Sequence, residues 1–351
     1  MKIGLARQAA TEWVRMHARK EKGYLGAYFS GSTVGRLDQD TLPVGSDVDV
    51  VVVRDGQEPP PKLGKLIYQN TLIEVTYISS GQLDSAEQVL RSYHLAGSFR
   101  TDTLIDDPTG RLRQLQQQVS QHFYESNWIV HRCMEARNRT ESGLRSLNVG
   151  APLHELAMSW LFPTGVMTHV VLVAALRNPT VRLRYLKARE VLEGYGLADI
   201  HQELLGFLGC ADWTAKQTEH HLLGLEETFD AAAKFAHTEF FFSSDITPQA
   251  RPIAIDGSRV LIQEGNHREA VFWIAATYAR CLHILAVDAP EEHQRLRSLF
   301  ESLLADLGMT AKQDFIQRGQ AALDYMPKLW DIAERIMNAN PEIEQRNASK
   351  E

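Results

Sequence analysis

The chain of 351 residues is long enough for two modest domains, and its 44% hydrophobic and 23% charged residues are ordinary for a globular protein. That composition excludes a disordered or fibrous chain. The formal net charge of -7 offers no broad attraction to a polyphosphate backbone. It therefore disfavours nucleic acid as a partner and suits a cationic small molecule better.

The sequence predicts neither a signal peptide nor a membrane-spanning helix. The first twenty residues mix charges with apolar side chains at helical spacing, and they lack the continuous apolar region of a signal peptide. The longest apolar stretch, 166–176, contains Thr168 and His169 and is shorter than the roughly 20 residues that a spanning helix needs. We therefore expect a cytoplasmic protein that does not associate with a membrane.

The first third of the sequence predicts one helix and a small mixed β-sheet. Apolar residues recur at helical spacing from Leu5 to Met16, and Gly23 follows the predicted helix as a stop. Runs rich in β-branched and aromatic residues then predict strands. These strands lie at 24–30, 47–53, 66–68 and 72–78.

The pattern changes to long helical stretches from about Gln82 onward. The clearest helical stretches are 111–147, 152–161, 180–194 and 268–287. A turn cluster at 106–110 marks the predicted boundary. We therefore predict an α+β chain in which a small mixed-sheet domain, 1–110, precedes a helical-bundle domain, 111–340, and a polar, frayed tail, 341–351.

The most informative segment joins two predicted strands. The first strand ends at Gly31-Ser32, and the second opens with Asp47-Val48-Asp49 and continues into a run of valines. Side chains alternate along a strand, so Asp47 and Asp49 point to the same face. Such neighbouring carboxylates repel, and a bound divalent ion is one usual resolution, beside a shared proton or solvent exposure. Gly31 allows a close backbone approach, and Ser32 offers an amide and a hydroxyl at an expected helix N-terminus, where phosphate binds well.

This order of strand, Gly-Ser turn and Asp-x-Asp strand resembles the nucleotidyltransferase superfamily typified by DNA polymerase beta. Its members carry a third carboxylate on a later strand, and Glu74 is the matching position here. The closer similarity is to the bacterial antibiotic nucleotidyltransferases of the kanamycin type, which join a catalytic domain of this size to a helical domain. The resemblance covers residues 24–78. Many relatives have Arg-Gly after the Gly-Ser turn, whereas this chain has Gly35-Arg36, so no phosphate role is assigned to Arg36.

The resemblance implies a reaction and a site. An acceptor hydroxyl attacks the α-phosphate of a nucleoside triphosphate in line, and pyrophosphate leaves. Asp47, Asp49 and Glu74 would hold two Mg²⁺ ions. Gly31 and Ser32 would join the two aspartates in binding ATP or another nucleoside triphosphate.

The resemblance also implies a general base. In the kanamycin group this base is a glutamate of the helical domain, and a lysine one turn later touches the nucleotide phosphates. The closest match is Glu141 with Arg145, although Glu135 with Arg139 has the same spacing. The base therefore stays open between Glu141 and Glu135.

We therefore expect transfer of AMP, or another nucleoside monophosphate, to a hydroxyl of a small polar acceptor. An aminoglycoside-like antibiotic fits this description, and such an activity would confer antibiotic resistance. Because kanamycin-type relatives form dimers, a homodimer is also implied. Two alternatives stay open: nucleotidyl transfer to RNA or protein, as in toxin and antitoxin pairs, and a non-catalytic nucleotide-binding sensor. Retention of three carboxylates argues against the sensor.

Overall fold

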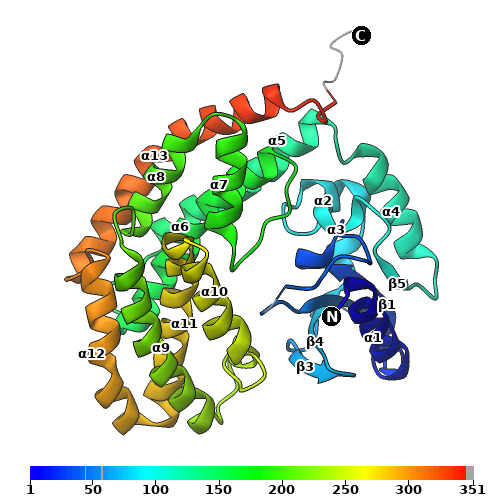
Figure 1. The fold of residues 1–351 in the computed structure, drawn as a ribbon. Helices are drawn as coiled ribbons and strands as arrows, with labels where there is room; N and C mark the ends of the chain where they lie inside the picture. The colour runs from blue at the N-terminus through cyan, green and yellow to red at the C-terminus, as the bar shows by residue number, and fades with distance from the viewer. Residues whose placement is uncertain (44, 57, 345–351) are drawn as a thin grey trace. The chain divides into compact units, whose positions relative to one another are not determined.

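The computed structural model describes residues 1–43, 45–56 and 58–344 (Figure 1). Over these residues the chain has a five-stranded mixed sheet and thirteen α-helices, which confirms the predicted mixed α+β class. Clustering of contacts separates two compact units. The sheet unit comprises Met1–Glu135, Leu176–Pro179 and the described residues from Asn340 on, and the helical unit comprises Ala136–Ala175 and Thr180–Ala339. The division falls inside a helix and not at the predicted turn cluster 106–110.

The sheet unit carries all five strands and the first helices. Its strands are β1 (Tyr24–Ser30), β2 (Val48–Arg54), β3 (Gly64–Tyr68), β4 (Thr71–Ser79) and β5 (Leu104–Asp106). Its helices are α1 (Ile3–Met16), α2 (Ala86–Arg91), α3 (Ala96–Phe99), α4 (Arg111–His122) and the beginning of α5 (Ser126–Arg145). The strand order is β3-β4-β2-β1-β5, with β2 and β4 parallel and the other neighbours antiparallel. The four predicted strands are present, whereas β5 was not predicted.

Both faces of the sheet are covered, which explains the run of valines in β2. Val50 and Val52 pack with the apolar side of α1, including Ala10 and Val14. Val51 and Val53 belong to the cluster on the other face, to which α2, α3 and α4 contribute. A strand buried on both faces reads as a continuous apolar run. Asp47 and Asp49 continue the alternation of Val51 and Val53, so they belong to the face that α2 and α4 cover.

The predicted helical stretch 111–147 is interrupted between α4 and α5, which corrects that prediction. Backbone groups at the break pair with the end of the chain, where the N–H of Glu344 donates to the Tyr124 carbonyl at 2.9 Å. Arg132 also donates to the Phe123 carbonyl at 2.8 Å. These partners satisfy backbone groups that a continuous helix would have paired internally. The start of the predicted tail is therefore not frayed, because Ile343 is buried and the Glu344 backbone is hydrogen-bonded, while the rest of the predicted tail lies outside the described residues.

The helical unit is built around two long apolar helices, α6 (Leu153–Ala174) and α11 (His267–Asp288). The other helices are α7 (Arg184–Gly194), α8 (Ala198–Leu208), α9 (Ala215–Phe235), α10 (Gly257–Gln263), α12 (Pro290–Asp306) and α13 (Lys312–Ala339). α11 packs against α6, α9 and α12, and α13 packs against α6. α6 and α11 are long and apolar enough to cross a membrane, but 78% and 83% of their most apolar windows are buried inside the chain. This burial is consistent with the core helices of a soluble protein.

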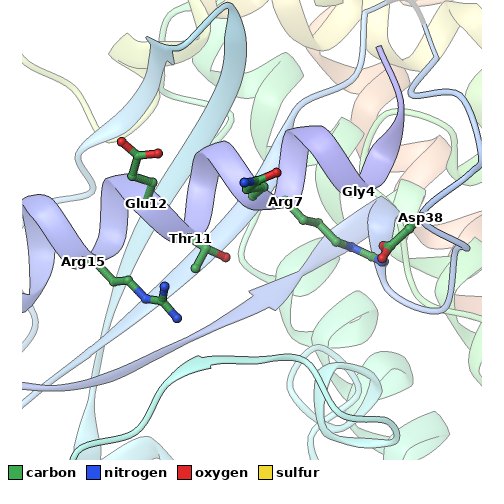
Figure 2. A pocket seen from close by; sticks show the side chains of 7 residues that line it. Gly4, Arg7, Thr11, Glu12, Arg15 and Asp38 are labelled. Atoms are coloured by element: carbon green, nitrogen blue, oxygen red, sulfur yellow. The ribbon is translucent and has the colours of Figure 1, made fainter.

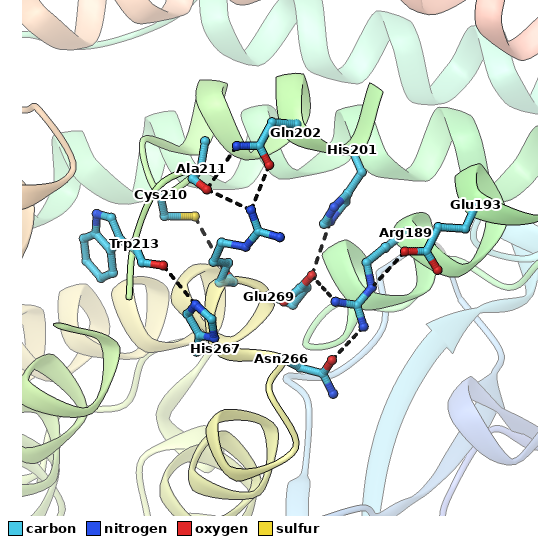
Figure 3. A network of polar contacts seen from close by, with 11 residues as sticks. Arg189, Glu193, His201, Gln202, Cys210, Ala211, Trp213, Asn266, His267 and Glu269 are labelled. Atoms are coloured by element: carbon cyan, nitrogen blue, oxygen red, sulfur yellow. Dashed lines mark hydrogen bonds and ion pairs between the residues drawn. The ribbon is translucent and has the colours of Figure 1, made fainter. Parts of the chain in front are cut away.

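A polar network fixes the start of α11 against α7 and α8 (Figure 3). Glu269 is 1% exposed and accepts a hydrogen bond from Arg189 at 2.7 Å. Arg189 also donates to the Asn266 side chain at 2.6 Å, and the His201 ring lies 3.7 Å from Glu269. Nearby, His267 contacts the Trp213 carbonyl at 2.9 Å. A buried carboxylate needs such a partner, because an isolated buried charge is strongly destabilising.

We predict that acid destabilises the protein through His169 of α6. The ring is buried, with Nε2 3.0 Å from the Thr180 carbonyl. Burial and the positive charge of Arg184 hold the pKa of His169 well below its ordinary value. The unfolded chain therefore binds a proton at a higher pH than the folded chain does. The stabilisation is present above the unfolded pKa of about 6.5, and it falls by up to about 1.4 kcal/mol per pH unit below it.

Urea unfolding between pH 7.5 and 5 checks this prediction by comparing the chain with His169→Gln. Other histidines also titrate, so the difference between the two slopes isolates the His169 contribution. The variant should be less stable at pH 7.5 but lose less stability on acidification. Identical slopes for the two proteins would contradict the prediction.

Candidate functional site

Strand register aligns polar side chains in one row across the sheet. Asp49 of β2 is paired with Ser30 of β1 on one side and with Glu74 of β4 on the other. Glu74 is paired in turn with Lys65 of β3. Residues at the same level of neighbouring strands that share a face lie close enough to interact. The row therefore brings together groups that are far apart in the sequence.

The three predicted carboxylates form one cluster. Asp47 immediately precedes β2, two residues before Asp49, and one carboxylate oxygen from each of Asp47, Asp49 and Glu74 lies within 4.8 Å of the others. Oxygen atoms of carboxylates are the protein ligands that Mg²⁺ prefers. The cluster thus has the donor atoms and the spacing to hold a hard divalent cation.

Gly31 makes room for the Asp49 carboxylate. Its φ is +65°, and a Cβ atom built there would lie 1.8 Å from Oδ2 of Asp49. Any side chain would therefore strain the backbone and collide with the carboxylate. The close approach at Gly31 is to the Asp49 carboxylate, and the predicted contact of Gly31 with a nucleotide stays a prediction.

The expected helix N-terminus after the Gly-Ser turn is absent, which is a correction. Gly31–Thr33 forms one turn of 3-10 helix, and Val34 is extended with ψ of 127°. Gly35 then takes a φ of +78°, so the helical turn cannot continue. Ser32 is exposed on this turn. It offers a hydroxyl and an amide, without the dipole of a long helix.

Crowding and burial shift the carboxylates in opposite directions. Burial and the negative charges of Asp47 and Glu74 raise the pKa of Asp49 well above its ordinary value. Burial also raises the pKa of Asp47, against the opposing charge of Lys65. Burial alone would raise the pKa of Glu74, but the ammonium groups of Lys65 and Lys62 outweigh it and hold the pKa at about 2. The three carboxylates are therefore crowded, and a bound cation would relieve the repulsion among them.

Lys62 and Lys65 were missed by the sequence analysis. Lys65 lies 2.8 Å from Glu74 and 3.2 Å from Asp47, and Lys62 forms an ion pair with Glu74. The signal that could have revealed Lys65 is the hairpin between β3 and β4. Gln69 and Asn70 both have positive φ, as a two-residue turn requires, and counting back from that turn pairs Lys65 with Glu74.

Arg7 of α1 holds the loop that follows the Gly-Ser turn. It donates to the Thr33 and Arg36 carbonyls and forms an ion pair with Asp38 at 2.8 Å. Figure 2 shows Arg7 and Asp38 in a hollow along α1. α1 covers the face of the sheet opposite to the carboxylates, so this hollow is separate from the cluster. Arg36 pairs with Asp40 at 2.9 Å, which is a structural contact within the loop.

The two candidate bases have different surroundings. Glu135, in the sheet unit, accepts a hydrogen bond from the backbone N–H of Tyr93 at 2.6 Å. Glu141, in the helical unit, lies between Arg137 at 2.7 Å and Arg145 at 3.7 Å. Glu135 thus has a structural contact that explains its presence. Among the described residues, the ion-pair partners of Glu141 are its neighbours on α5, and its role as the base for the carboxylate cluster stays a prediction.

Comparison with known proteins adds no family to these observations. No model of a protein family matches the sequence, and no curated protein matches it as a relative. The carboxylate cluster and its surroundings are therefore the basis for a functional conclusion.

Proposed function

We propose that the chain is a Mg²⁺-dependent nucleotidyltransferase that moves a nucleoside monophosphate to a hydroxyl of a small polar acceptor. ATP is the proposed donor and an aminoglycoside-like cation the proposed acceptor. The observation that carries this proposal is the cluster of Asp47, Asp49 and Glu74 beside Gly31. Because ATP is found inside the cell, the proposed donor favours a cytoplasmic location. The acidic net charge favours a cationic acceptor.

The three carboxylates fit a divalent cation in number, donor type and spacing. Asp47, Asp49 and Glu74 would hold Mg²⁺. The superfamily that the sequence resembles implies two such ions. Bound there, Mg²⁺ would neutralise the triphosphate and the charge that develops on the α-phosphate. The new bond joins the acceptor oxygen to the α-phosphorus, and the bond to pyrophosphate breaks. The hydroxyl proton goes to the general base.

The lysines of the cluster take different parts in this proposal. The side chain of Lys65 is only 7% exposed, and it pairs with Asp47 and Glu74. It stays in place and limits the repulsion among the carboxylates. Lys62 lies before β3 with 28% of its side chain exposed. We propose that the Lys62 ammonium group turns from Glu74 to the triphosphate when the nucleotide and Mg²⁺ bind. The positive charge of Mg²⁺ at the carboxylates would repel the ammonium group.

The experiment that tests the proposal uses the full chain with Mg²⁺, each of the four nucleoside triphosphates labelled at the α-phosphate, and panels of aminoglycosides and lincosamides. Pyrophosphate release and label on the acceptor should both require Mg²⁺ and a hydroxyl-bearing compound. Label on added RNA or on protein would identify the macromolecular alternative. Nucleotide binding with no pyrophosphate release under any condition would contradict a transferase and identify a sensor.

We expect Glu141→Gln to lower kcat by about 10²-fold, because a general base contributes roughly that much or more. KM for the nucleotide should change little, since the substitution preserves size and removes only the proton-accepting carboxylate. Glu135→Gln is the matched control on the same helix, and it should lower stability through Tyr93 rather than kcat. A loss of kcat in the control alone would assign the base to Glu135 instead.

A further inference from the structure

A second group of metal-ligating side chains lies within the helical unit. His154 and Glu155 lie in the first turn of α6, and His283 lies near the end of α11. One possible ligand atom from each of the three lies within 4.8 Å of the other two. The sequence analysis did not select these residues, because His283 is far from the other two in the chain.

The distances between the possible ligand atoms are close to those in a tetrahedral zinc site. Zinc bonds of about 2.0–2.1 Å in a tetrahedron place ligand atoms about 3.3 Å apart. Nδ1 of His283 already lies 3.5 Å from Oε1 of Glu155. The possible ligand atoms of all three residues lie within 4.8 Å of one another.

One imidazole of this group lacks a hydrogen bond that buried ring nitrogens normally make. His154 is 5% exposed, and its ring packs edge-on against the rings of His283 and His293. Nδ1 of His283 is buried, and among the described residues it has no hydrogen-bond partner, although the Glu155 carboxylate lies 3.5 Å away. Buried polar side-chain atoms are nearly always satisfied, so each exception needs an explanation. A bound metal ion would accept the lone pair of this nitrogen.

We propose that His154, Glu155 and His283 form a binding site for a divalent transition metal ion of the zinc class. Imidazole nitrogen combined with one carboxylate suits zinc, whereas magnesium prefers oxygen ligands. Three protein ligands leave a position for water or for His293, whose ring centroid is 5.6 Å from that of His154. The ion fixes the beginning of α6 to the end of α11. This site belongs to the helical unit and is distinct from the carboxylates of the sheet unit.

Zinc binding by the full chain tests the proposal. The protein is stripped with a chelator, titrated with Zn²⁺ in competition with a chromophoric chelator, and separately loaded with Co²⁺ for a visible spectrum. We expect one tight Zn²⁺ per chain and the spectrum of a four-coordinate Co²⁺ site. His283→Gln should weaken Zn²⁺ binding by at least about 100-fold, since even partners outside the ligand shell cost 10–100-fold. His220→Gln, at an exposed position of α9, is the control and should bind as the unchanged chain does.

Further variants separate this site from the carboxylate cluster and from misfolding. Asp49→Asn should keep the tight Zn²⁺ and the Co²⁺ spectrum. Glu155→Gln, with circular dichroism to verify folding, should lose both, as His283→Gln does. The proposal is overturned if His283→Gln and Glu155→Gln bind Zn²⁺ like the unchanged chain, or if Asp49→Asn is the variant that loses it.

Discussion

Asp49→Asn is expected to lower nucleotidyl transfer by about 10³-fold or more. Asn keeps the shape of the side chain but removes one charge from the cluster that would hold Mg²⁺. Charge stabilisation by bound metal supplies several kcal/mol to a phosphoryl transition state, and about 4 kcal/mol corresponds to 10³-fold in rate. The rate of pyrophosphate release at saturating nucleotide, with and without acceptor, measures this loss.

Stability distinguishes this loss from simple unfolding. Asp49 is crowded by Asp47 and Glu74, and burial together with those charges raises its pKa. The Asn variant relieves that repulsion, so its free energy of unfolding should stay the same or increase. Asp55→Asn is the control, because Asp55 is exposed just beyond the other end of β2. Equal activity in the Asp49 variant and the control would remove Asp49 from the mechanism.

Gly31→Ala is expected to lower transfer nearly as much, by about 10³-fold. The added methyl group would lie 1.8 Å from Oδ2 of Asp49, so the carboxylate must move from its place beside Asp47 and Glu74. The positive φ adds about 1 kcal/mol of backbone strain. Transfer rate and Mn²⁺ affinity, measured on the same preparation, report the displaced carboxylate.

Gly110→Ala is the matched control for backbone strain in the same unit. Gly110 has a φ of +74°, but no atom lies within 4 Å of the Cβ position. Both variants should lose similar stability from strain, while only Gly31→Ala should lose activity. If both variants retained full transfer, Gly31 would have no part in positioning Asp49.

The central strand and its pair of aspartates could be predicted because their signals are local. A valine-rich strand buried on both faces and the alternation of Asp47 and Asp49 are read from adjacent residues. The parallel pairing of β2 with β4 then places Glu74 beside Asp49. That pairing is a long-range contact, and the superfamily resemblance supplied it in advance.

Other features depend on contacts that neighbouring residues do not reveal. β5 has only three residues and is defined by its pairing with β1. Backbone groups at the break before α5 are hydrogen-bonded to Glu344, which is far away in the sequence. Predicting the position of Lys65 requires the register of the hairpin between β3 and β4. The turn residues of that hairpin, Gln69 and Asn70, are not glycines and so do not mark the turn clearly. The group of His154, Glu155 and His283 is brought together by the packing of α6 against α11, which neighbouring residues in the sequence do not reveal.

The central claim is that Asp47, Asp49 and Glu74 bind the divalent ions of a nucleotide-transfer reaction. A crystal of the full chain with Mn²⁺ and a non-hydrolysable ATP analogue tests this directly, because anomalous scattering locates the metal. We predict Mn²⁺ between these three carboxylates, with the triphosphate next to Gly31 and Ser32. Nucleotide bound elsewhere, with no Mn²⁺ at the three carboxylates, would contradict the account.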